Sequence, residues 1–261
     1  MYQLSKHEKD KIVPLFKDWN ETLIWSCLQG YMGNAWVNNN TKPTSAQIIV
    51  GDFCFFAGVP DAELVNNIPE SFVSDFILMV PRSEAWEALI EEEYRNTLNK
   101  FMRYAIKKEP EVFDREKLKR NILQLSPEYK LKQIDEELYL KCRSEEWSKD
   151  LCSQFPTYDD YKKLGVGYVI LHDDKPVSGA SSYTVYEKGI EIEIDTKEDY
   201  RRRGLALVCA SKLILECLER NLYPSWDAAN KASVALAEKL GYHFEEEYVT
   251  YSIPVKAGGK D

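Results

Sequence analysis

The stretch from Glu191 to Ala206, EIEIDTKEDYRRRGLA, decides the interpretation of this chain. Its first part alternates Glu with Ile, which predicts a β-strand, and its last part opens an amphipathic helix expected from Gly204 to about Arg220. The first turn of a helix leaves backbone N–H groups unpaired, and the helix dipole favours negative charge there. Gly204 and the small Ala206 let a ligand approach the backbone, and the arginines at 201–203 add charge-assisted donors. The stretch therefore predicts a site for a phosphate-bearing ligand.

Two common phosphate loops are excluded at this site. No Lys-Ser/Thr pair follows Gly204, so it is not a Walker A loop, and the chain contains no G-x-G-x-x-G dinucleotide fingerprint. The alternative interpretation is a solvated basic patch at the start of a helix. Basic side chains at that end oppose the helix dipole, which argues against an arbitrary placement.

The strand that precedes this loop carries a second chemical signal. Period-two alternation puts its isoleucines on one face and three carboxylates on the other: Glu191, Glu193 and Asp195. Neighbouring carboxylates raise one another's pKa, and a carboxylate with a raised pKa can accept a proton from an ammonium group. Glu191 and Glu193 are the two candidates for such a base, and their order is open, since a β-bulge can change which one faces a cleft. The alternative is a solvated acidic face of an antiparallel sheet.

Composition limits the classes of partner. The chain has 261 residues, with 34 Lys and Arg against 43 Asp and Glu, a formal charge of −9. This balance argues against non-specific binding to nucleic acid or to an anionic membrane, which needs a basic face. The length is enough for one large or two small domains.

The cysteines and the N-terminal stretch bear on the compartment. Six scattered cysteines without a C-x-x-C spacing favour reduced core thiols over disulfides, and three widely separated histidines give no zinc signature, so no metal site is expected. The polar start, MYQLSKHEKDK, lacks the apolar region of a secretory signal, and no apolar run approaches the roughly 18 residues of a membrane helix. We expect a cytoplasmic protein.

The second half of the chain predicts a regular order of elements. Asp135 and Thr157 are expected to cap helices after a strand at 129–134, and Asp173-Asp174-Lys175-Pro176 predicts a hairpin turn between strands at 165–172 and 177–186. After the long helix we expect a short strand at 225–228, a helix from Lys231 to Leu240 that ends at Gly241, and a last strand at 248–253.

The first half mixes helices and strands in a similar way. Ser5 and Glu8 form a capping-box pattern that predicts a helix to about Gln29 despite Pro14, and residues 46–59 predict two buried strands or one bent strand with a break at Gly51-Asp52. Strands are expected at 75–80 and 101–106, with helices after Ser83 and Asp114. The polar stretch at Ser126-Pro127 predicts the domain boundary, giving domains 1–127 and 128–261.

Two of these motifs together resemble a known family. Arg-x-x-Gly-x-Ala at 201–206, between a strand and a helix, is similar to the pyrophosphate motif of the GNAT superfamily of N-acetyltransferases. Residues 225–242, SWDAANKASVALAEKLGY, resemble that superfamily's later strand and helix, and the element order over 129–253 follows its fold. In detail the chain looks most similar to the bacterial group that includes zwittermicin A resistance protein. The resemblance covers about the last half of the chain.

The resemblance implies a cofactor, acetyl-CoA, and assigns residues to it. Backbone N–H groups of Arg202, Arg203, Gly204, Leu205 and Ala206 would hold the pyrophosphate, and Arg201 would add charge. The strand end, Ile194, Asp195 and Thr196, would bind the pantetheine arm, while Asn230 and Ser233 would touch the cofactor from the next helix. A neutral amine would then attack the thioester directly, with Glu191 or Glu193 as the base.

The chain departs from the family at one position. Many GNAT enzymes carry a tyrosine in the later helix as general acid for the thiolate, and the aligned residue here is Ala237. The first half resembles a degenerate copy of the fold, since Val80-Pro81-Arg82-Ser83-Glu84-Ala85 lacks the glycine pattern. We expect this half to bind no acetyl-CoA and to close one side of the substrate cleft or mediate dimerisation.

The expectation is thus an α+β protein of two GNAT-like halves, with a mostly antiparallel sheet and flanking helices. Its second half would be an acetyl-CoA-dependent N-acetyltransferase for a small-molecule amine. The resemblance implies an amino-bearing antibiotic, with a protein acceptor as an alternative. No nucleic-acid or membrane partner is expected, and a homodimer is left open. The competing hypothesis is a catalytically weak or regulatory acyl-CoA-binding module, which Ala237 favours.

Overall fold

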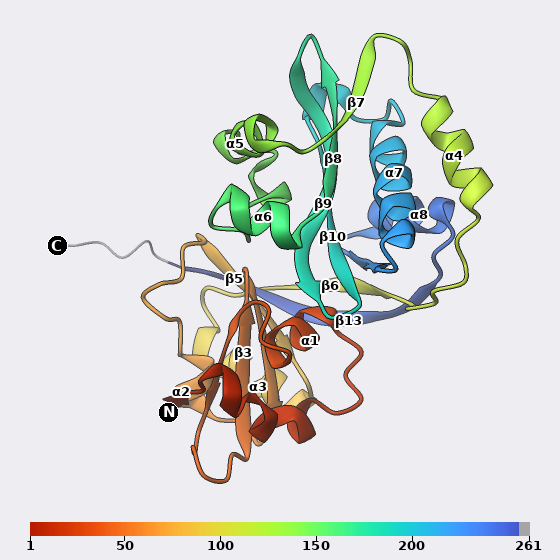
Figure 1. Cartoon of the computed structure of the whole chain (residues 1–261). Helices are drawn as coiled ribbons and strands as arrows, with labels where there is room; N and C mark the ends of the chain where they lie inside the picture. The colour runs from red at the N-terminus through yellow and green to blue at the C-terminus, as the bar shows by residue number, and fades with distance from the viewer. Residues whose placement is uncertain (256–261) are drawn as a thin grey trace, which may run out of the picture. The chain divides into compact units, whose positions relative to one another are not determined.

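The computed structural model describes residues 1–255, and the chain forms two compact units (Figure 1). The first unit contains Met1–Arg103 together with residues 247–255, and the second contains Tyr104–Glu246. The predicted boundary at 127 therefore lies inside the second unit. The physical reason is the helix at Arg115–Leu123, whose Asn121 donates a buried 3.0 Å hydrogen bond to Ser211 of the long helix.

The first unit begins with short helical segments and then builds a mixed sheet. Its elements are β1 (Tyr2–Gln3), the 3-10 helix η1 (Lys6–Phe16), α1 (Thr22–Leu28), β2 (Asn34–Val37), β3 (Ser45–Val50), β4 (Phe53–Gly58), α2 (Ala62–Val65), β5 (Phe76–Pro81) and α3 (Glu84–Tyr94). Two further strands belong to it in part: β6 (Asn99–Ile106) up to Arg103, and β13 (Phe244–Pro254) from Glu247. β2, β3 and β4 are antiparallel, β5 is parallel to β4, and β13 is antiparallel to β5. Residues 46–59 thus form two strands, with Gly51 at the turn in the left-handed region.

The core of this unit lies between the sheet and α3. Trp86 of α3 is fully buried, stacks on Phe56 with ring centroids 5.1 Å apart, and donates a hydrogen bond to the Gly58 carbonyl. Leu64 and Ile77 belong to the same apolar cluster. Burying such side chains supplies most of the driving force for folding.

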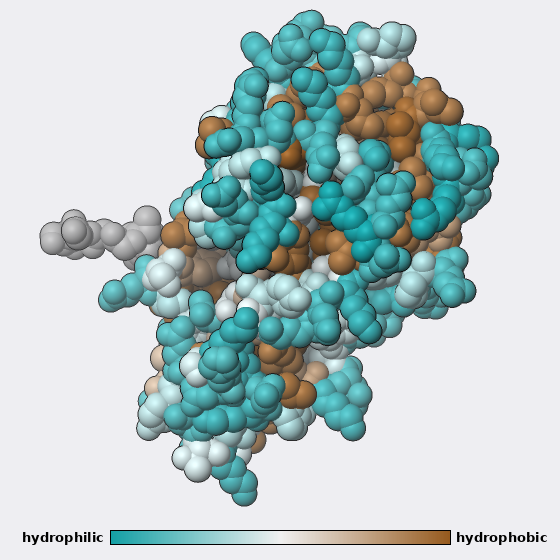
Figure 2. All heavy atoms as spheres, viewed as in Figure 1, coloured by the Kyte–Doolittle hydropathy of each residue, from teal (hydrophilic) through white to brown (hydrophobic). Residues whose placement is uncertain are grey.

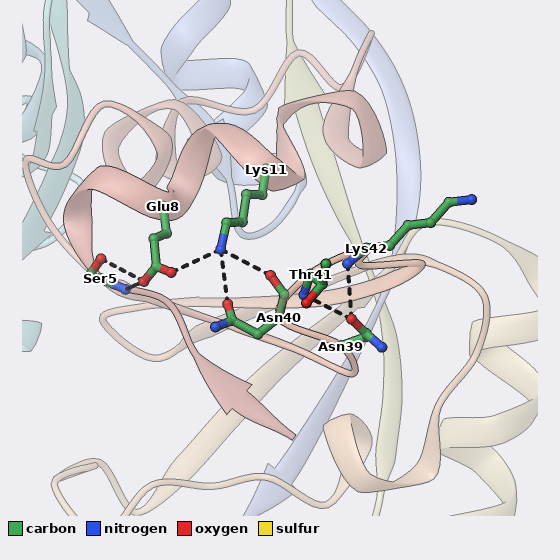
Figure 3. A network of polar contacts seen from close by, with 7 residues as sticks. All are labelled: Ser5, Glu8, Lys11, Asn39, Asn40, Thr41 and Lys42. Carbon is green, nitrogen blue, oxygen red and sulfur yellow. Dashed lines mark hydrogen bonds and ion pairs between the residues drawn. The ribbon is translucent and has the colours of Figure 1, made fainter.

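The N-terminal segment differs from the single helix expected over residues 5–29. The Ser5–Glu8 capping box forms, but the helix is of the 3-10 type through Pro14, and Asp18, with φ 60°, breaks it before α1. Proline removes a backbone donor and clashes with the preceding turn, which explains the loss of α-helical bonding. Lys11 links this helix to the β2–β3 loop through the carbonyl and side chain of Asn40 (Figure 3).

The second unit contains the long helix and a sheet of its own. Its elements are α4 (Arg115–Leu123), β7 (Tyr129–Gln133), α5 (Glu136–Ser144), η2 (Lys149–Leu151), α6 (Tyr158–Leu164), β8 (Gly167–His172), β9 (Lys175–Tyr186), β10 (Gly189–Thr196), η3 (Glu198–Tyr200), α7 (Leu205–Glu219), β11 (Tyr223–Ser225), β12 (Asp227–Ala228) and α8 (Lys231–Leu240). The strand order is β11-β10-β9-β8-β7, parallel between β10 and β11 and antiparallel elsewhere.

Helices cover both faces of this sheet (Figure 1). On one face, Tyr168 of β8 donates a 2.7 Å hydrogen bond to Glu216 of α7. On the other, Tyr161 of α6 lies 2.8 Å from the Ser181 hydroxyl of β9. The predicted amphipathic pattern of α7 is confirmed, because its apolar positions, among them Val208 and Leu213, are buried.

The two units repeat one order of elements. β2-β3-β4 followed by α2, β5 and α3 corresponds to β8-β9-β10 followed by α7, β11 and α8, and in each case the fourth strand is parallel to the third. Both sheets are mixed and mostly antiparallel with flanking helices, which confirms the predicted fold class.

Three general features bear on the earlier expectations. All six cysteines are buried free thiols. Within residues 1–255, no helix combines the length and the apolar character that crossing a bilayer requires. Most of the face drawn in Figure 2 is hydrophilic in both units.

Candidate functional site

A pocket of about 480 Å³ lies at the N-terminus of α7 in the second unit. Its lining comes from three neighbouring elements: the end of β10, the loop into α7, and α8. The lining residues are Thr196, Tyr200, Arg201, Arg202, Gly204, Leu205, Ala206, Leu207, Ala232, Leu236 and Lys239. The volume is within the range of about 300–1,000 Å³ usual for ligand pockets. The structure thus brings the predicted anion loop to the wall of a real cavity.

The loop into α7 has an unusual backbone. Arg202 has φ 61° and Gly204, at the N-cap of α7, has φ 79°, so both lie in the left-handed region. A Cβ added at Gly204 would meet nothing within 4 Å, which leaves open space directly above this backbone. The first helical N–H groups, from Leu205 to Leu207, have no acceptor inside the helix. This arrangement offers a ligand several backbone donors at the positive end of the dipole.

The three arginines have different environments. Arg201 lines the pocket, and its Nε donates to the Thr196 carbonyl at 3.1 Å, which orients its guanidinium. Arg202 is exposed and also lines the pocket. Arg203 is not among the lining residues, since its guanidinium donates to Tyr129 Oη at 3.3 Å and to the Asp199 carbonyl at 2.8 Å. Only two of the three arginines therefore present charge to the pocket.

Another wall of the pocket comes from α8, through three residues that were not predicted to belong to the site. Ala232, Leu236 and Lys239 have the i, i+4, i+7 spacing of one helical face. This spacing, together with the lysine at the end of the face, is the feature of the sequence from which the wall could have been predicted. These residues give the pocket an apolar wall that ends in a positive charge. Tyr200 of η3 was missed too, because nothing in the sequence distinguishes it from a packing tyrosine.

Asn230 and Ser233, predicted to touch the cofactor, are engaged elsewhere. The Asn230 side chain caps α8 by accepting from the Ser233 N–H at 3.0 Å. The Ser233 hydroxyl accepts from Trp226 Nε1 at 3.0 Å. Neither residue lines the pocket. In this structure the Asn-x-x-Ser pattern builds the start of α8, and the neighbouring Ala232 forms the wall.

The carboxylates of β10 lie on the sheet face away from α7. Glu191 pairs across strands with Thr184, Glu193 with Ser181 and Asp195 with Gly179. The hydroxyl of Ser181 lies 2.8 Å from that of Tyr161 in α6, so these side chains are on the sheet face that α6 covers. A register shift falls between Glu191 and Ile192 and leaves an extra residue, Tyr183, on the facing strand β9. Glu191 is 5% exposed, whereas Glu193 and Asp195 are half-buried.

The carboxyl group of Asp195 is half-buried at the end of β10. Burial raises the pKa of its carboxyl group, and a hydrogen bond from the Thr196 N–H, at 2.7 Å, acts in the opposite direction. Ile194, Asp195 and Thr196 form the end of β10, and Thr196 is the one that lines the pocket. The three predicted pantetheine-binding residues are thus contiguous with the pocket wall.

The position at which many GNAT enzymes have the general-acid tyrosine is buried in this chain. Ala237 of α8 is fully buried. Tyr242, the nearest tyrosine in the chain, donates to the Pro224 carbonyl at 2.6 Å, and burial raises the pKa of its phenol well above the usual value. Neither position presents a proton donor to the pocket.

The residues around the pocket fit a phosphate-bearing ligand with an apolar arm. Arg201, Arg202 and Lys239 supply charge, and the α7 N-terminus supplies backbone donors. Leu236 and Leu207 supply apolar contact. The open space above Gly204 is where a bulky diphosphate would meet the backbone.

Comparison with known proteins gives one consistent result. The family model described as GNAT acetyltransferase matches residues 13–251. The uncharacterized N-acetyltransferase YdfB of Bacillus subtilis is 27% identical over 270 residues, covering 96% of this chain and 98% of that protein. A crystal structure of a GCN5-related N-acetyltransferase-like protein from Streptococcus suis is 45% identical, with a TM-score of 0.90 over 95% of this chain and 98% of that one.

A more distant structure bears on the repeated fold. A tandem GNAT protein from the clavulanic acid biosynthesis pathway is 10% identical, with a TM-score of 0.54 over 99% of this chain and 98% of that one. This likeness shows a shared fold across both units. Because the family model spans most of the chain and the Streptococcus suis relative matches nearly all of it, this chain belongs to the GNAT family of acetyltransferases.

Proposed function

We propose that this protein transfers the acetyl group of acetyl-CoA to a primary amine of a small molecule, by direct attack of the amine on the thioester. The observation that carries the proposal is the pocket at the α7 N-terminus, where the left-handed Gly204 leaves open space over the first helical N–H groups. A diphosphate needs this combination of backbone donors, close approach and cationic rim.

Different parts of the pocket bind different parts of acetyl-CoA. Backbone N–H groups from Arg202 to Ala206 hold the pyrophosphate, and Arg201, Arg202 and Lys239 neutralise its charge. The β10 end at 194–196 binds the pantetheine arm by backbone hydrogen bonds. When bound, acetyl-CoA supplies the acetyl group as an activated thioester. The side chain of Arg203 acts on the loop and not on the ligand, because its guanidinium is held by Tyr129 and Asp199.

A base is needed because an amine attacks only when it is neutral. Glu191 and Glu193 are the candidates to accept the ammonium proton, and they lie on the same face of β10 as Asp195. The raised pKa of Asp195 makes it a third carboxylate able to exchange protons in this row. The departing thiolate receives no proton from α8, since Ala237 occupies the position.

The substrate and the compartment are inferred from the family resemblance, the carboxylates of β10 and the cysteines. The resemblance to the group that includes zwittermicin A resistance protein favours an amino-bearing antibiotic as acceptor. The row of carboxylates favours a cationic amine over an acidic one. Six free buried thiols are consistent with a reaction in the reducing cytoplasm.

Release of the coenzyme A thiol in the presence of a panel of primary amines tests the proposal. We expect amine-dependent release, and a loss of about 10²–10⁴-fold in kcat for Glu191→Gln or Glu193→Gln, whichever is the base. Glu219→Gln, at the far end of α7, is the matched control and retains full activity. Binding of acetyl-CoA without any turnover across the panel would instead support the regulatory acyl-CoA-binding alternative. Equal activity of both Gln variants and wild type would exclude the carboxylate base.

A further inference from the structure

His172, the last residue of β8, is connected to the wall of the α7 pocket through one tyrosine. Its Nδ1 lies 3.1 Å from the hydroxyl oxygen of Tyr200, which is a hydrogen-bond distance, and the two ring centroids are 5.5 Å apart. Tyr200 directly precedes Arg201, and both residues line the pocket. The side chain of His172 is 28% exposed, so it can exchange protons with solvent. One hydrogen bond thus separates a titratable side chain from the pocket wall.

The side chain of Tyr200 is contacted at two places. His172 is within hydrogen-bond distance of its hydroxyl group, and the guanidinium of Arg203 lies over its ring. Arg203 also donates to Tyr129, whose ring centroid is 5.3 Å from that of His172. These four side chains form one cluster beside the loop into α7. The cluster contains none of the carboxylates proposed as the base, so it acts on the cofactor side of the site.

A carboxylate faces each nitrogen of the imidazole ring. Glu128 Oε2 is 3.9 Å from Nε2, and Asp173 Oδ2 is 3.6 Å from Nδ1. Nearby negative charge favours the protonated ring, while nearby cations oppose it. Histidine side chains change charge between about pH 5 and 8. The titratable and charged residues around this ring are Glu128 before β7, Tyr129 in β7, Asp173 in the β8–β9 turn, Lys175 in β9, Tyr200 in η3 and, beyond Tyr129, Arg203.

The protonation state of the imidazole determines the strength of its hydrogen bond to Tyr200. A neutral imidazole and a phenol form a neutral hydrogen bond, in which Nδ1 either accepts or donates. An imidazolium donates from Nδ1 to the phenol oxygen, and such a charge-assisted bond is roughly twice as strong. Protonation of His172 therefore holds Tyr200 more firmly, together with the chain segment that begins at Arg201.

We propose that His172 is a positioning residue for the acetyl-CoA site, and that its protonated form holds Tyr200 in the orientation that the bound cofactor requires. The inference rests on the proposed use of acetyl-CoA. A loop that is ordered before the ligand arrives reduces the entropic cost of binding. The affinity for acetyl-CoA is therefore higher when His172 carries a proton. The effect falls on the KM for acetyl-CoA and not on kcat, because the cluster is not part of the proposed base.

Calorimetric titration of acetyl-CoA at about pH 6 and about pH 8.5 is the first test. His172→Asn keeps a polar amide near the place of Nδ1 and cannot be protonated. Its Kd should exceed that of the wild type by about two- to fivefold at the lower pH and match it at the higher pH. The ratio of the two Kd values cancels the titration of the ligand's own phosphates. His243→Asn removes a histidine that pairs with Glu109 at 2.7 Å, and its ratio should stay at one. A His172→Asn ratio that does not change with pH would overturn the proposal.

Tyr200→Phe tests whether the effect passes through the hydroxyl group. The variant keeps the ring beneath Arg203 and removes the partner of His172. It should lose the same pH-dependent part of the affinity, and adding His172→Asn should cause no further loss. If Tyr200→Phe keeps the advantage at the lower pH, the imidazolium acts by its charge alone, and the positioning role is wrong.

Thermal unfolding without ligand separates this inference from the proposed function. In a double-mutant cycle of His172→Asn and Tyr200→Phe, the two substitutions should be coupled by about 2–4 °C in Tm at about pH 6 and uncoupled at about pH 8.5. Absence of coupling at the lower pH would count against the His172–Tyr200 bond alone. Coupling in a protein that binds no acetyl-CoA at either pH would overturn the proposed function, and the positioning role with it.

Discussion

The guanidinium of Arg203 lies over the ring of Tyr200, 4.9 Å from its centroid. The same group donates hydrogen bonds to Tyr129 Oη and to the Asp199 carbonyl, and the bond to Tyr129 raises the pKa of Arg203. Tyr200 lines the pocket. The third arginine of the motif thus holds the loop whose other two arginines line the pocket.

Arg202 lines the pocket, whereas the side chain of Arg203 holds the loop. We therefore predict different effects when each is replaced by alanine. Arg202→Ala removes a cation from the rim, so acetyl-CoA should bind more weakly and with a smaller dependence on salt. Arg203→Ala should weaken binding through loop disorder while the salt dependence stays as in wild type, and it should lower Tm because a cation–π contact of about 0.5–1 kcal/mol is lost. Calorimetric titrations at low and high salt measure both. Equal salt slopes in the two variants would show that the arginines are not differentiated.

Alanine variants of two glycines in the left-handed region allow the effect of backbone strain to be measured apart from the effect on ligand binding. Gly204 has φ 79° at the start of α7, and Gly241 has φ 111° at the end of α8. An alanine at either position is strained by about 1–2 kcal/mol, so both variants should melt at a lower temperature. Only Gly204→Ala places a methyl group in the open space over the loop. It should lose at least tenfold in acetyl-CoA affinity, the equivalent of about 1.4 kcal/mol, whereas Gly241→Ala should bind normally. Similar affinities in both variants would place the diphosphate elsewhere.

The α8 wall can be tested through its terminal charge. Lys239→Glu reverses a charge that lines the pocket and should weaken binding of acetyl-CoA. Lys231→Glu makes the same change at the exposed other end of the helix and should have little effect on binding. If the two reversals weaken binding equally, a general field effect explains the result, and the α8 wall is not in contact with the ligand.

Asp195 predicts a pH dependence of stability with a definite sign. Its pKa is raised in the folded state, so the folded protein binds more protons than the unfolded chain between about pH 3.9 and the raised value, and this contribution to stability is lost as pH increases through that window. Asp195→Asn removes the effect. The variant should therefore melt above wild type at pH 7 and match it near pH 3. Thermal unfolding across this range measures the gap, and a gap that widens toward low pH would contradict the assignment.

Much of the fold could be predicted because its signals are local. Asp135 and Thr157 cap helices as their side chains require, and Asp173-Asp174 form the β8–β9 turn with φ values of 48° and 59°. Gly204 marks the start of α7 by a conformation that favours glycine. These features depend on a few neighbouring residues, so the sequence alone determines them.

The remaining features depend on contacts distant in the chain. The motif predicts that the charge of Arg203 adds to the anion site, yet Tyr129, far away in sequence, holds its guanidinium. The assignment of α4 to the second unit depends on its packing against α7, where Asn121 donates a hydrogen bond to Ser211. Lys239 joins the site only because α8 packs beside the α7 loop. Spacing within one element does not reveal such contacts.

Thermal unfolding of the wild-type protein and of Gly204→Glu, each with and without acetyl-CoA, tests whether the α7 pocket is the cofactor site. A ligand at about a hundred times its Kd adds roughly 2.7 kcal/mol to the free energy of unfolding. We predict that acetyl-CoA raises the Tm of the wild type and leaves that of Gly204→Glu unchanged. An equal increase in both proteins, or no increase in the wild type at millimolar acetyl-CoA, would contradict the assignment of this pocket.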